Sequence, residues 1–167
     1  MNLETVFDFS GKVAVVLGGS GVLCGVLAKA LGRQGASVVV AGHTRMDRAR
    51  QVASAIVAQG GEAIALQADV LDKQSLQALA QQTLATFGHV DILINGAGGA
   101  KKEATTSEQS SFFDLPEDAV RWVFDLNFMG TFLACQVFGR TMVEQGRGCI
   151  LNIASMGAVR PLTRPRC

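Results

Sequence analysis

The sequence predicts an α/β domain of three layers, with a doubly wound parallel sheet between two layers of helices. Short β-branched runs alternate with longer amphipathic stretches along the 167 residues. The short runs are apolar at nearly every position, as is typical of strands covered on both faces. Glycines follow the longer stretches, where a positive φ angle helps to end a helix. The predicted strands are 13–17, 37–41, 63–67, 90–94 and 149–153, and the predicted helices are 22–34, 46–59, 73–87 and 117–145.

We expect this domain to span residues 1–154, and residues 155–167 to form an irregular tail. The tail holds two prolines and three arginines and has no helix or strand pattern. A sheet that ends in such a tail leaves its fifth strand as an unpaired edge with only part of the usual helical cover. The sequence therefore predicts a fold that is incomplete at its C-terminal end.

Composition limits the kinds of partner that the chain can have. Its 15 basic and 14 acidic residues give a net charge of +1 and form no long runs of one sign, which argues against nucleic acid and anionic membranes. A small-molecule substrate is the better expectation. The N-terminus does not resemble a secretion signal, and no apolar run is long enough for a membrane span, so we expect a cytoplasmic protein. The four cysteines are far apart, which favours reduced thiols over a metal site or disulfides.

A glycine-rich turn, Leu17-Gly-Gly-Ser-Gly-Val-Leu-Cys-Gly25, follows the first predicted strand and opens into a helix. Such a turn lets the backbone approach a pyrophosphate closely, and free N–H groups at the helix start attract the anion. Cys24 stands where the third glycine of the fingerprint is usual. The place of the turn between strand and helix favours dinucleotide binding over a glycine-rich turn without a ligand. The residues expected to bind the cofactor here are Gly18, Ser20, Gly21, Val22 and Leu23.

The end of the second predicted strand bears on the choice between NAD and NADP. An acidic side chain there would bond the ribose hydroxyls and repel a 2′-phosphate, but Gly42 stands in its place. His43, Thr44 and Arg45 follow and could bind a phosphate, so the sequence favours NADP over NAD; a solvated polar turn is the alternative. Asp69 and Val70 follow the third strand and are expected near the adenine, unless Asp69 is an ordinary turn residue.

Five short motifs follow one another along the chain: Gly18-x-x-Gly21, Asp69-Val70, Asn95-Gly-Ala-Gly98, Asn127-Phe-Met-Gly130 and Ile153-Ala-Ser155. In this order they resemble the short-chain dehydrogenase/reductase family over essentially the whole chain. Within the family, the D-mannonate oxidoreductase (fructuronate reductase) branch is similar to this chain in four segments: Asn95-Gly-Ala-Gly-Gly99, Ala104-Thr-Thr106, Phe112-Phe-Asp-Leu115 and Arg160-Pro-Leu-Thr-Arg164. The resemblance implies a Rossmann-like domain and an NAD(P)-dependent oxidoreductase that acts on a hydroxyl or carbonyl group. For the D-mannonate branch, the implied substrate is a sugar acid.

The resemblance also implies roles for particular residues. Asn95, Gly96 and Ala97 would lie beside the cofactor and stabilise the central sheet. Asn127 would hold a water of a proton relay through its backbone, and Ser155 would hydrogen-bond the substrate oxygen. Taken singly, Asn95 is also a common turn former and Ser155 a common strand-end hydroxyl; the accompanying motifs favour the functional roles.

One departure from the family concerns the reaction itself. The chain has no tyrosine, and the Tyr-x-x-x-Lys motif that provides the family's proton donor would be expected about where the chain stops. Loss of a general acid–base group costs typically about 10²–10⁴-fold in rate, so we expect a truncated form with negligible turnover. A catalytically dead dinucleotide-binding sensor or interaction module is the alternative.

The long loop after the fourth predicted strand and the helix that follows it predict a substrate lid and a subunit interface. Residues 98–115 are a candidate lid, in which Lys101 and Lys102, or Arg160 further along, could pair with the carboxylate of a sugar acid. The predicted helix 117–145 is apolar around much of its circumference, and in the family it packs at a subunit interface. The full-length form is therefore expected to be a homo-oligomer.

Overall fold

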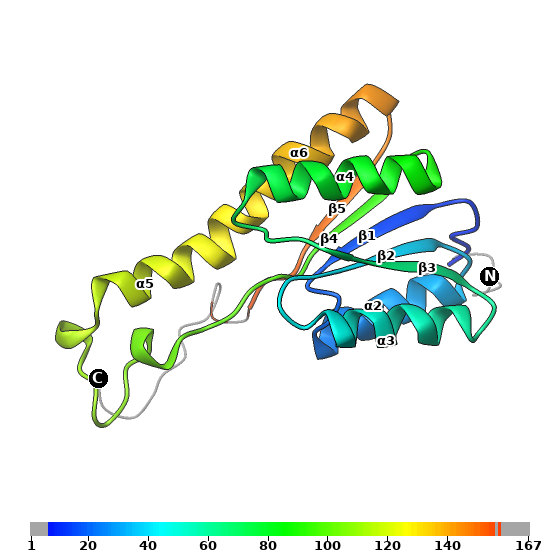
Figure 1. Ribbon diagram of the computed structural model, residues 1–167. Coiled ribbons are helices and arrows are strands. Elements are labelled where there is room, and N and C mark those ends of the chain that lie inside the picture. Colours follow the sequence, from blue (N-terminus) through cyan, green and yellow to red (C-terminus); the bar gives the residue numbers. More distant parts are fainter. Residues whose placement is uncertain (1–6, 156, 158–167) are drawn as a thin grey trace.

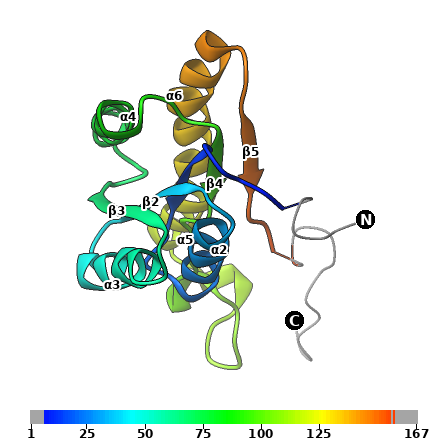
Figure 2. The same cartoon turned by 90° about the vertical axis from the view of Figure 1, so that its right-hand side faces the viewer.

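A computed structural model of the chain describes residues 7–155 and 157. Its strands are β1 (Val13–Leu17), β2 (Ser37–Gly42), β3 (Glu62–Gln67), β4 (Ile92–Asn95) and β5 (Cys149–Asn152), and its main helices are α2 (Val22–Arg33), α3 (Met46–Val57), α4 (Lys73–Phe87), α5 (Glu117–Phe124) and α6 (Gly130–Gln145). All strand pairs are parallel, in the order β3-β2-β1-β4-β5. Helices α2 and α3 lie on one face of the sheet, and α4 and α6 on the other (Figures 1 and 2). The predicted three-layer fold is confirmed.

The sheet has an apolar core on each face, and this explains why its strands are apolar at nearly every residue. Along β1, Val15 and Leu17 belong to the core beneath α4 and α6, whereas Val16 belongs to the core beneath α2 and α3. Successive strand residues point to opposite faces, so a sheet covered on both sides needs apolar residues at both parities. Phe138 of α6 and Ile56 of α3 are the largest fully buried side chains of the two layers.

Strand β5 forms an edge of the sheet, as the sequence predicts (Figure 2). All four of its residues are exposed. On the α2 side, the surface of β4 and β5 borders a groove of about 940 Å³ whose lining includes Leu31, Ile94 and Leu151. The expected tail, residues 155–167, lies outside the described residues except for positions 155 and 157.

The prediction of one regular helix over residues 117–145 was wrong in one respect. Helices α5 and α6 are joined by a π-helical turn, Asp125–Met129, and together they run out beyond the sheet (Figure 1). Directly after this turn the helix comes very close to the loop that follows β3: a methyl group on Gly130 would lie 2.8 Å from Val70 Cγ2. The candidate lid is also less irregular than expected, because it contains two short 3₁₀ helices, Lys102–Ala104 and Phe112–Asp114.

Asp91 joins three strands at the amino end of the sheet. Its carboxylate accepts hydrogen bonds from Val13 N (3.0 Å) and Arg147 Nε (2.8 Å), and it lies 3.0 Å from His89 Nε2 and 3.9 Å from Lys12 Nζ. Its backbone carbonyl accepts from the amide of the first β5 residue at 2.8 Å. Burial raises the pKa of Asp91, but these donors and charges outweigh burial, and the pKa lies below its usual value.

Replacing Asp91 by asparagine should lower the free energy of unfolding by about 2 kcal/mol near pH 7, because charge-assisted hydrogen bonds are lost. The pKa is lower in the folded chain than in the unfolded chain, so this stabilisation is present above the unfolded value, about 3.9, and is lost as the pH falls through the folded one. Urea unfolding from pH 7 to pH 3 should show the two proteins converging below about pH 4. Glu144→Gln, at an exposed position, is the control, and a gap that stays constant with pH would contradict the assignment.

Candidate functional site

A cleft lies at the carboxyl ends of the central strands. The strand order reverses between β1 and β4, and at such a switch point the two following loops leave the sheet in opposite directions and open a crevice. The register pairs Leu17 of β1 with Asn95 of β4, which sets the two loops side by side. The cleft has a volume of about 270 Å³ and is lined by Leu17, Gly18, Ser20, Gly21, Ala41, Gly42, His43, Thr44, Arg45, Ala68, Asp69, Val70, Gly96, Ala97, Gly98 and Leu126.

The glycine turn forms one wall of the cleft, and its backbone requires glycine at position 18. The φ angle of Gly18 is 74°, and a methyl group there would lie 2.6 Å from the carbonyl oxygen of Gly96 and 2.8 Å from the nitrogen of Ala97. The amide of Gly21 donates to the carbonyl of Gly18 at 2.8 Å, which closes the turn. No side chain caps the start of α2, so the amides of its first turn are free to bind an anion.

The loop after β2 brings three exposed polar residues to the cleft: His43, Thr44 and Arg45. His43 Nε2 lies 3.7 Å from Asp69 Oδ2, so the loops that follow β2 and β3 face each other. A side chain at Gly42 would be crowded, because its first carbon would lie 3.3 Å from both Met46 Sδ and Ala49 Cβ.

Asp69 and Val70 lie at the start of the loop after β3. Asp69 Oδ1 accepts from the amide of Leu71 at 2.9 Å, and the amide of Asp69 donates to Ser75 Oγ at 2.9 Å. Val70 is almost fully buried and faces Gly130. Asp69 therefore shapes its own turn while part of its side chain remains accessible from the cleft.

Asn95 is buried just beneath the cleft and braces the sheet. Its Nδ2 donates to Asn152 Oδ1 of β5 at 2.8 Å and to Cys135 Sγ of α6 at 3.3 Å. Its Oδ1 is buried without a hydrogen-bond partner. The side chain thus links β4 to β5 and to the helical layer, but it does not line the cleft.

Asn127 lies in the π-helical turn and binds the first residues of the candidate lid. Its Nδ2 donates to the carbonyl of Gly99 at 2.7 Å and to that of Val123 at 2.8 Å, while its Oδ1 accepts from the amide of Gly99 at 3.2 Å. Its own carbonyl accepts from Thr131 Oγ1 at 3.2 Å. Single π-helical turns are frequent at functional sites, because they shift the helix hydrogen-bonding pattern locally.

Five of the predicted residues lie outside the lining of the cleft: Val22, Leu23, Asn95, Asn127 and Ser155. Ser155 follows β5, is exposed, and accepts a hydrogen bond at Oγ from the amide of Gly157 at 3.2 Å. Val22 and Leu23, in the first turn of α2, are 87% and 58% exposed, so their side chains point into solvent. Their backbone amides, in the first turn of α2, are the groups that face the anion site at the helix start.

The sequence did not single out Ala41, Ala68 or Leu126, which also line the cleft. Ala41 and Ala68 adjoin predicted residues at the ends of β2 and β3, so their strand-end position was a usable signal. Leu126 arrives from the long helix, far along the chain from the other lining residues, and no local pattern marks it.

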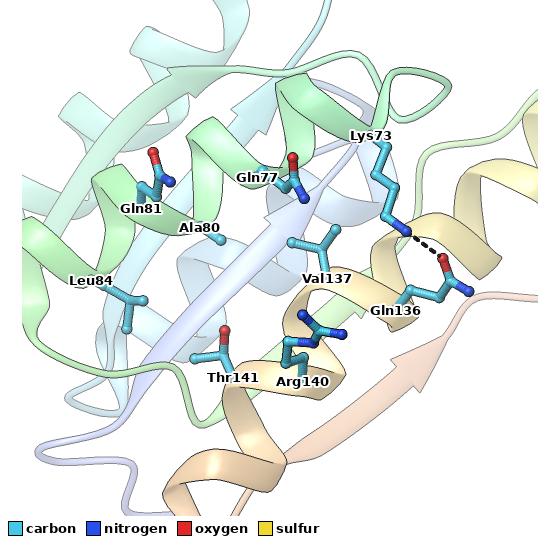
Figure 3. Close-up of a pocket in the computed structure, with 9 residues that line it drawn as sticks. All are labelled: Lys73, Gln77, Ala80, Gln81, Leu84, Gln136, Val137, Arg140 and Thr141. Atoms are coloured by element: carbon cyan, nitrogen blue, oxygen red, sulfur yellow. Dashed lines mark hydrogen bonds between the residues drawn. The ribbon is translucent and has the colours of Figure 1, made fainter.

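Another hollow, of about 510 Å³, lies between α4 and α6 (Figure 3). It shares no residue with the cleft, and no carboxylate, histidine or cysteine lines it. Lys73 Nζ donates there to Gln136 Oε1 at 3.0 Å. Among the described residues, no group of three His, Cys, Asp or Glu could hold a metal ion, and no helix is long and apolar enough to cross a membrane. The cleft is the better candidate site.

The family model for short chain dehydrogenases matches residues 12–165. The chain belongs to this family. The resemblance drawn from its five motifs is therefore confirmed.

Individual relatives agree with this. "Uncharacterized oxidoreductase UxuB" of Bacillus subtilis (strain 168) is 42% identical over 94% of the chain and 59% of its own length. A solved structure with bound NAD from Haemophilus influenza is provisionally described as a D-mannonate oxidoreductase. It is 34% identical to the chain, with a TM-score of 0.86, and the match covers 98% of the chain and 61% of that protein. A 7α-hydroxysteroid dehydrogenase solved with NADH and 7-oxo glycochenodeoxycholic acid is 32% identical, with a TM-score of 0.85. The match covers 97% of the chain and 60% of that protein. The chain thus spans about 60% of the length of such relatives.

Replacing Asn127 by alanine should loosen the candidate lid, because both hydrogen bonds to the backbone of Gly99 are lost. Amide hydrogen exchange in the segment that follows β4 should rise by roughly five-fold or more, as expected from the loss of about one net hydrogen bond. Thr131→Val removes a hydrogen bond to the same helical turn without touching the lid, and it is the control. Equal exchange in the Asn127→Ala and wild-type chains would show that this contact does not hold the lid.

Proposed function

We propose that this chain carries the dinucleotide-binding part of an NAD(P)-dependent short-chain oxidoreductase that acts on a hydroxyl or carbonyl group. The observation that carries the proposal is the cradle at Gly18, where the backbone of the turn approaches the Gly96–Ala97 loop so closely that no Cβ atom fits. A backbone surface of this kind, beside uncapped helix amides, suits a pyrophosphate. The family assignment supports the same conclusion.

Each predicted residue has a place in this proposal. Gly18, Ser20 and Gly21, with the backbone of Val22 and Leu23, would hold the pyrophosphate. Asp69 and Val70 would face the adenine, and Asn95, Gly96 and Ala97 would support the nicotinamide side. When bound, the nicotinamide supplies a hydride donor or acceptor.

Two residues would act on the substrate side. Ser155 would donate a hydrogen bond to the substrate oxygen, and Asn127 would hold a water through its backbone carbonyl. Neither group is a strong general acid, and the sequence contains no tyrosine. We therefore expect the 167-residue chain to bind the dinucleotide and to have negligible turnover. The second candidate, a dinucleotide-binding sensor or interaction module, is favoured by the same lack of a proton donor.

The proposed substrate is a sugar acid. Support comes from the provisional description of the Haemophilus relative as a D-mannonate oxidoreductase and from the lysines of the candidate lid. Lys101 Nζ lies 4.8 Å over the ring of Trp122, whereas Lys102 begins the first 3₁₀ helix. Lys102 is thus the better of the two to pair with a carboxylate. Arg160, the other candidate, lies outside the described residues. The cytoplasmic location stays a prediction.

The proposed cofactor preference is for NADP over NAD, although both relatives above were solved with the unphosphorylated form. The loop that directly follows β2 brings no acid to the cleft, and Thr44 and Arg45 are exposed there. The crowding around Gly42 disfavours an acidic side chain at the position that would repel a 2′-phosphate.

Fluorescence titration with NADPH and NADH tests these proposals. Binding should saturate for both and be tighter for NADPH. Arg45→Ala should weaken NADPH binding about ten-fold, because it removes a charge-assisted hydrogen bond to the 2′-phosphate, and it should change NADH binding little. Arg48→Ala is the control, because Arg48 is exposed nearby on α3 but does not line the cleft.

The outcomes separate the proposals from one another. If the wild-type chain bound neither nucleotide, the proposed function would be wrong. An equal loss of NADH and NADPH affinity in Arg45→Ala would remove the NADP preference alone. Measurable oxidation of NADPH with D-fructuronate would contradict the expected lack of turnover.

We also propose that the full-length form is a homo-oligomer. Phe124, Phe128 and Phe132 form a ladder along the long helix, with ring centroids 5.0 and 6.4 Å apart, and each ring is about half exposed. Phe138, in contrast, is fully buried against the sheet. An exposed aromatic stripe of this kind is typical of an interface.

The phenylalanine ladder lies within the 167 residues, so light scattering of this chain should already report a mass above its 17.5 kDa. Phe128→Lys should lower the mass towards that value, because a charge in the middle of the ladder resists burial. Val143→Lys places the same charge on α6 at another exposed apolar position and should leave the mass unchanged. A Phe128→Lys chain with the wild-type mass would place the interface elsewhere.

A further inference from the structure

Cys24 departs from the usual glycine fingerprint, and it fills a defined space. It is 4% exposed and belongs to the core between the sheet and helices α2 and α3. A methyl group built on Gly96 would overlap the Cys24 sulfur, whereas it would lie 3.6 Å from Cys24 Cβ, an ordinary contact distance. The sulfur atom is therefore the main obstacle to a side chain at Gly96, and the carbonyl oxygen of Leu17, 3.2 Å from such a methyl group, adds a tight backbone contact.

The other side of Gly96 meets the glycine turn. A methyl group on Gly18 would lie 2.6 Å from the carbonyl oxygen of Gly96. The amide of Gly96 donates a hydrogen bond to the carbonyl of Leu17 at 3.2 Å. The backbone of Gly96 is thus enclosed between the Gly18 turn and the Cys24 sulfur. Gly96 and Ala97 line the cleft, so whatever sets the position of this loop also sets the shape of the cleft wall.

We propose that Cys24 is a positioning residue for the dinucleotide site, whose sulfur holds the Gly96–Ala97 loop against the Gly18 turn. The two residues form a size-complementary pair, in which the larger residue on α2 requires the smallest one after β4. The inference rests on the proposed function, because it describes how the wall of a dinucleotide cleft is held in place.

The chemistry of the thiol suits this role. Burial raises the pKa of Cys24, so the thiol stays protonated and neutral at neutral pH. A neutral sulfur packs as a small apolar group and brings no negative charge beneath a site for phosphates.

A double-mutant cycle at the two positions tests the proposal. Gly96→Ala should weaken NADPH and NADH binding by roughly ten-fold or more, because its methyl group collides with the sulfur and pushes the loop out of place. Cys24→Ala alone should weaken binding by about three-fold, because the loop loses the sulfur that holds it. The double variant Cys24→Ala/Gly96→Ala should recover part of the lost affinity, because the new methyl group no longer meets the sulfur, whereas its 3.2 Å contact with the Leu17 carbonyl oxygen remains. Gly96 has no positive φ, so its backbone conformation does not by itself exclude alanine.

Two controls give the cycle its specificity. Cys24→Ala should fail to rescue Gly18→Ala, because a methyl group at Gly18 meets backbone atoms and position 18 has a positive φ. Gly139→Ala, in α6 with nothing within 4 Å of the added carbon, should leave affinity unchanged. If the Gly96→Ala chain is insoluble, the double variant should return soluble, nucleotide-binding protein.

Thermal melting of the chain without nucleotide, measured in parallel, separates positioning from simple core filling. If Cys24 only filled the core, the variants would shift the melting temperature while the affinity of the folded chain stayed the same, and that result would overturn the proposal. A double variant that binds no better than Gly96→Ala, or that stays insoluble, would also overturn it. Absence of binding by the wild-type chain would instead defeat the proposed function, and this inference with it.

Discussion

The close approach of two backbones, at Gly18 after β1 and at Gly96 after β4, is the constraint on which the rest of the site depends. The parallel register brings the ends of the two strands level, and the reversal of strand order sends their loops apart around a crevice. No side chain can be added at Gly18 without displacing the neighbouring loop. The glycines therefore determine the shape of the cleft, and the polar residues around them provide its charges and hydrogen-bonding groups.

The two ends of the sheet have different tasks. At the amino ends, Asp91 binds β1, the segment before β5, and β5 itself through its carboxylate and its carbonyl, and no ligand is needed there. At the carboxyl ends, Asn95 makes a similar brace to Asn152, but one of its polar atoms stays unsatisfied beneath the cleft. The stabilising hydrogen bonds of Asp91 thus lie at the amino ends of the strands, whereas the backbone and charged groups that a ligand can reach lie at the carboxyl ends. This division agrees with the general placement of ligand sites in open parallel sheets.

The sequence predicted the strands well, because sheets covered on both faces leave a continuous apolar signal at each strand. It also located the cleft, because strand ends can be read from that signal. The break in the long helix was not predicted, since it coincides with long-range contacts: Asn127 binds Gly99, and Gly130 packs against Val70. Periodicity within a helix carries no information about such partners. In the same way, Cys24 looked like a defect in a motif, and only its position beside Gly96 shows what the sulfur occupies.

Strand β5 has a consequence for how copies of the chain can meet. In the described part of the chain its outer backbone groups have no partner strand, while Ile150 and Leu151 present apolar surface on opposite faces. Two β5 edges that join about a two-fold axis would close into one continuous sheet and stop there. A β5 edge that joins the β3 edge of the next copy would not close, and the sheet would grow into a fibre. The choice of edge therefore decides whether copies of the chain form a closed pair or an open fibre.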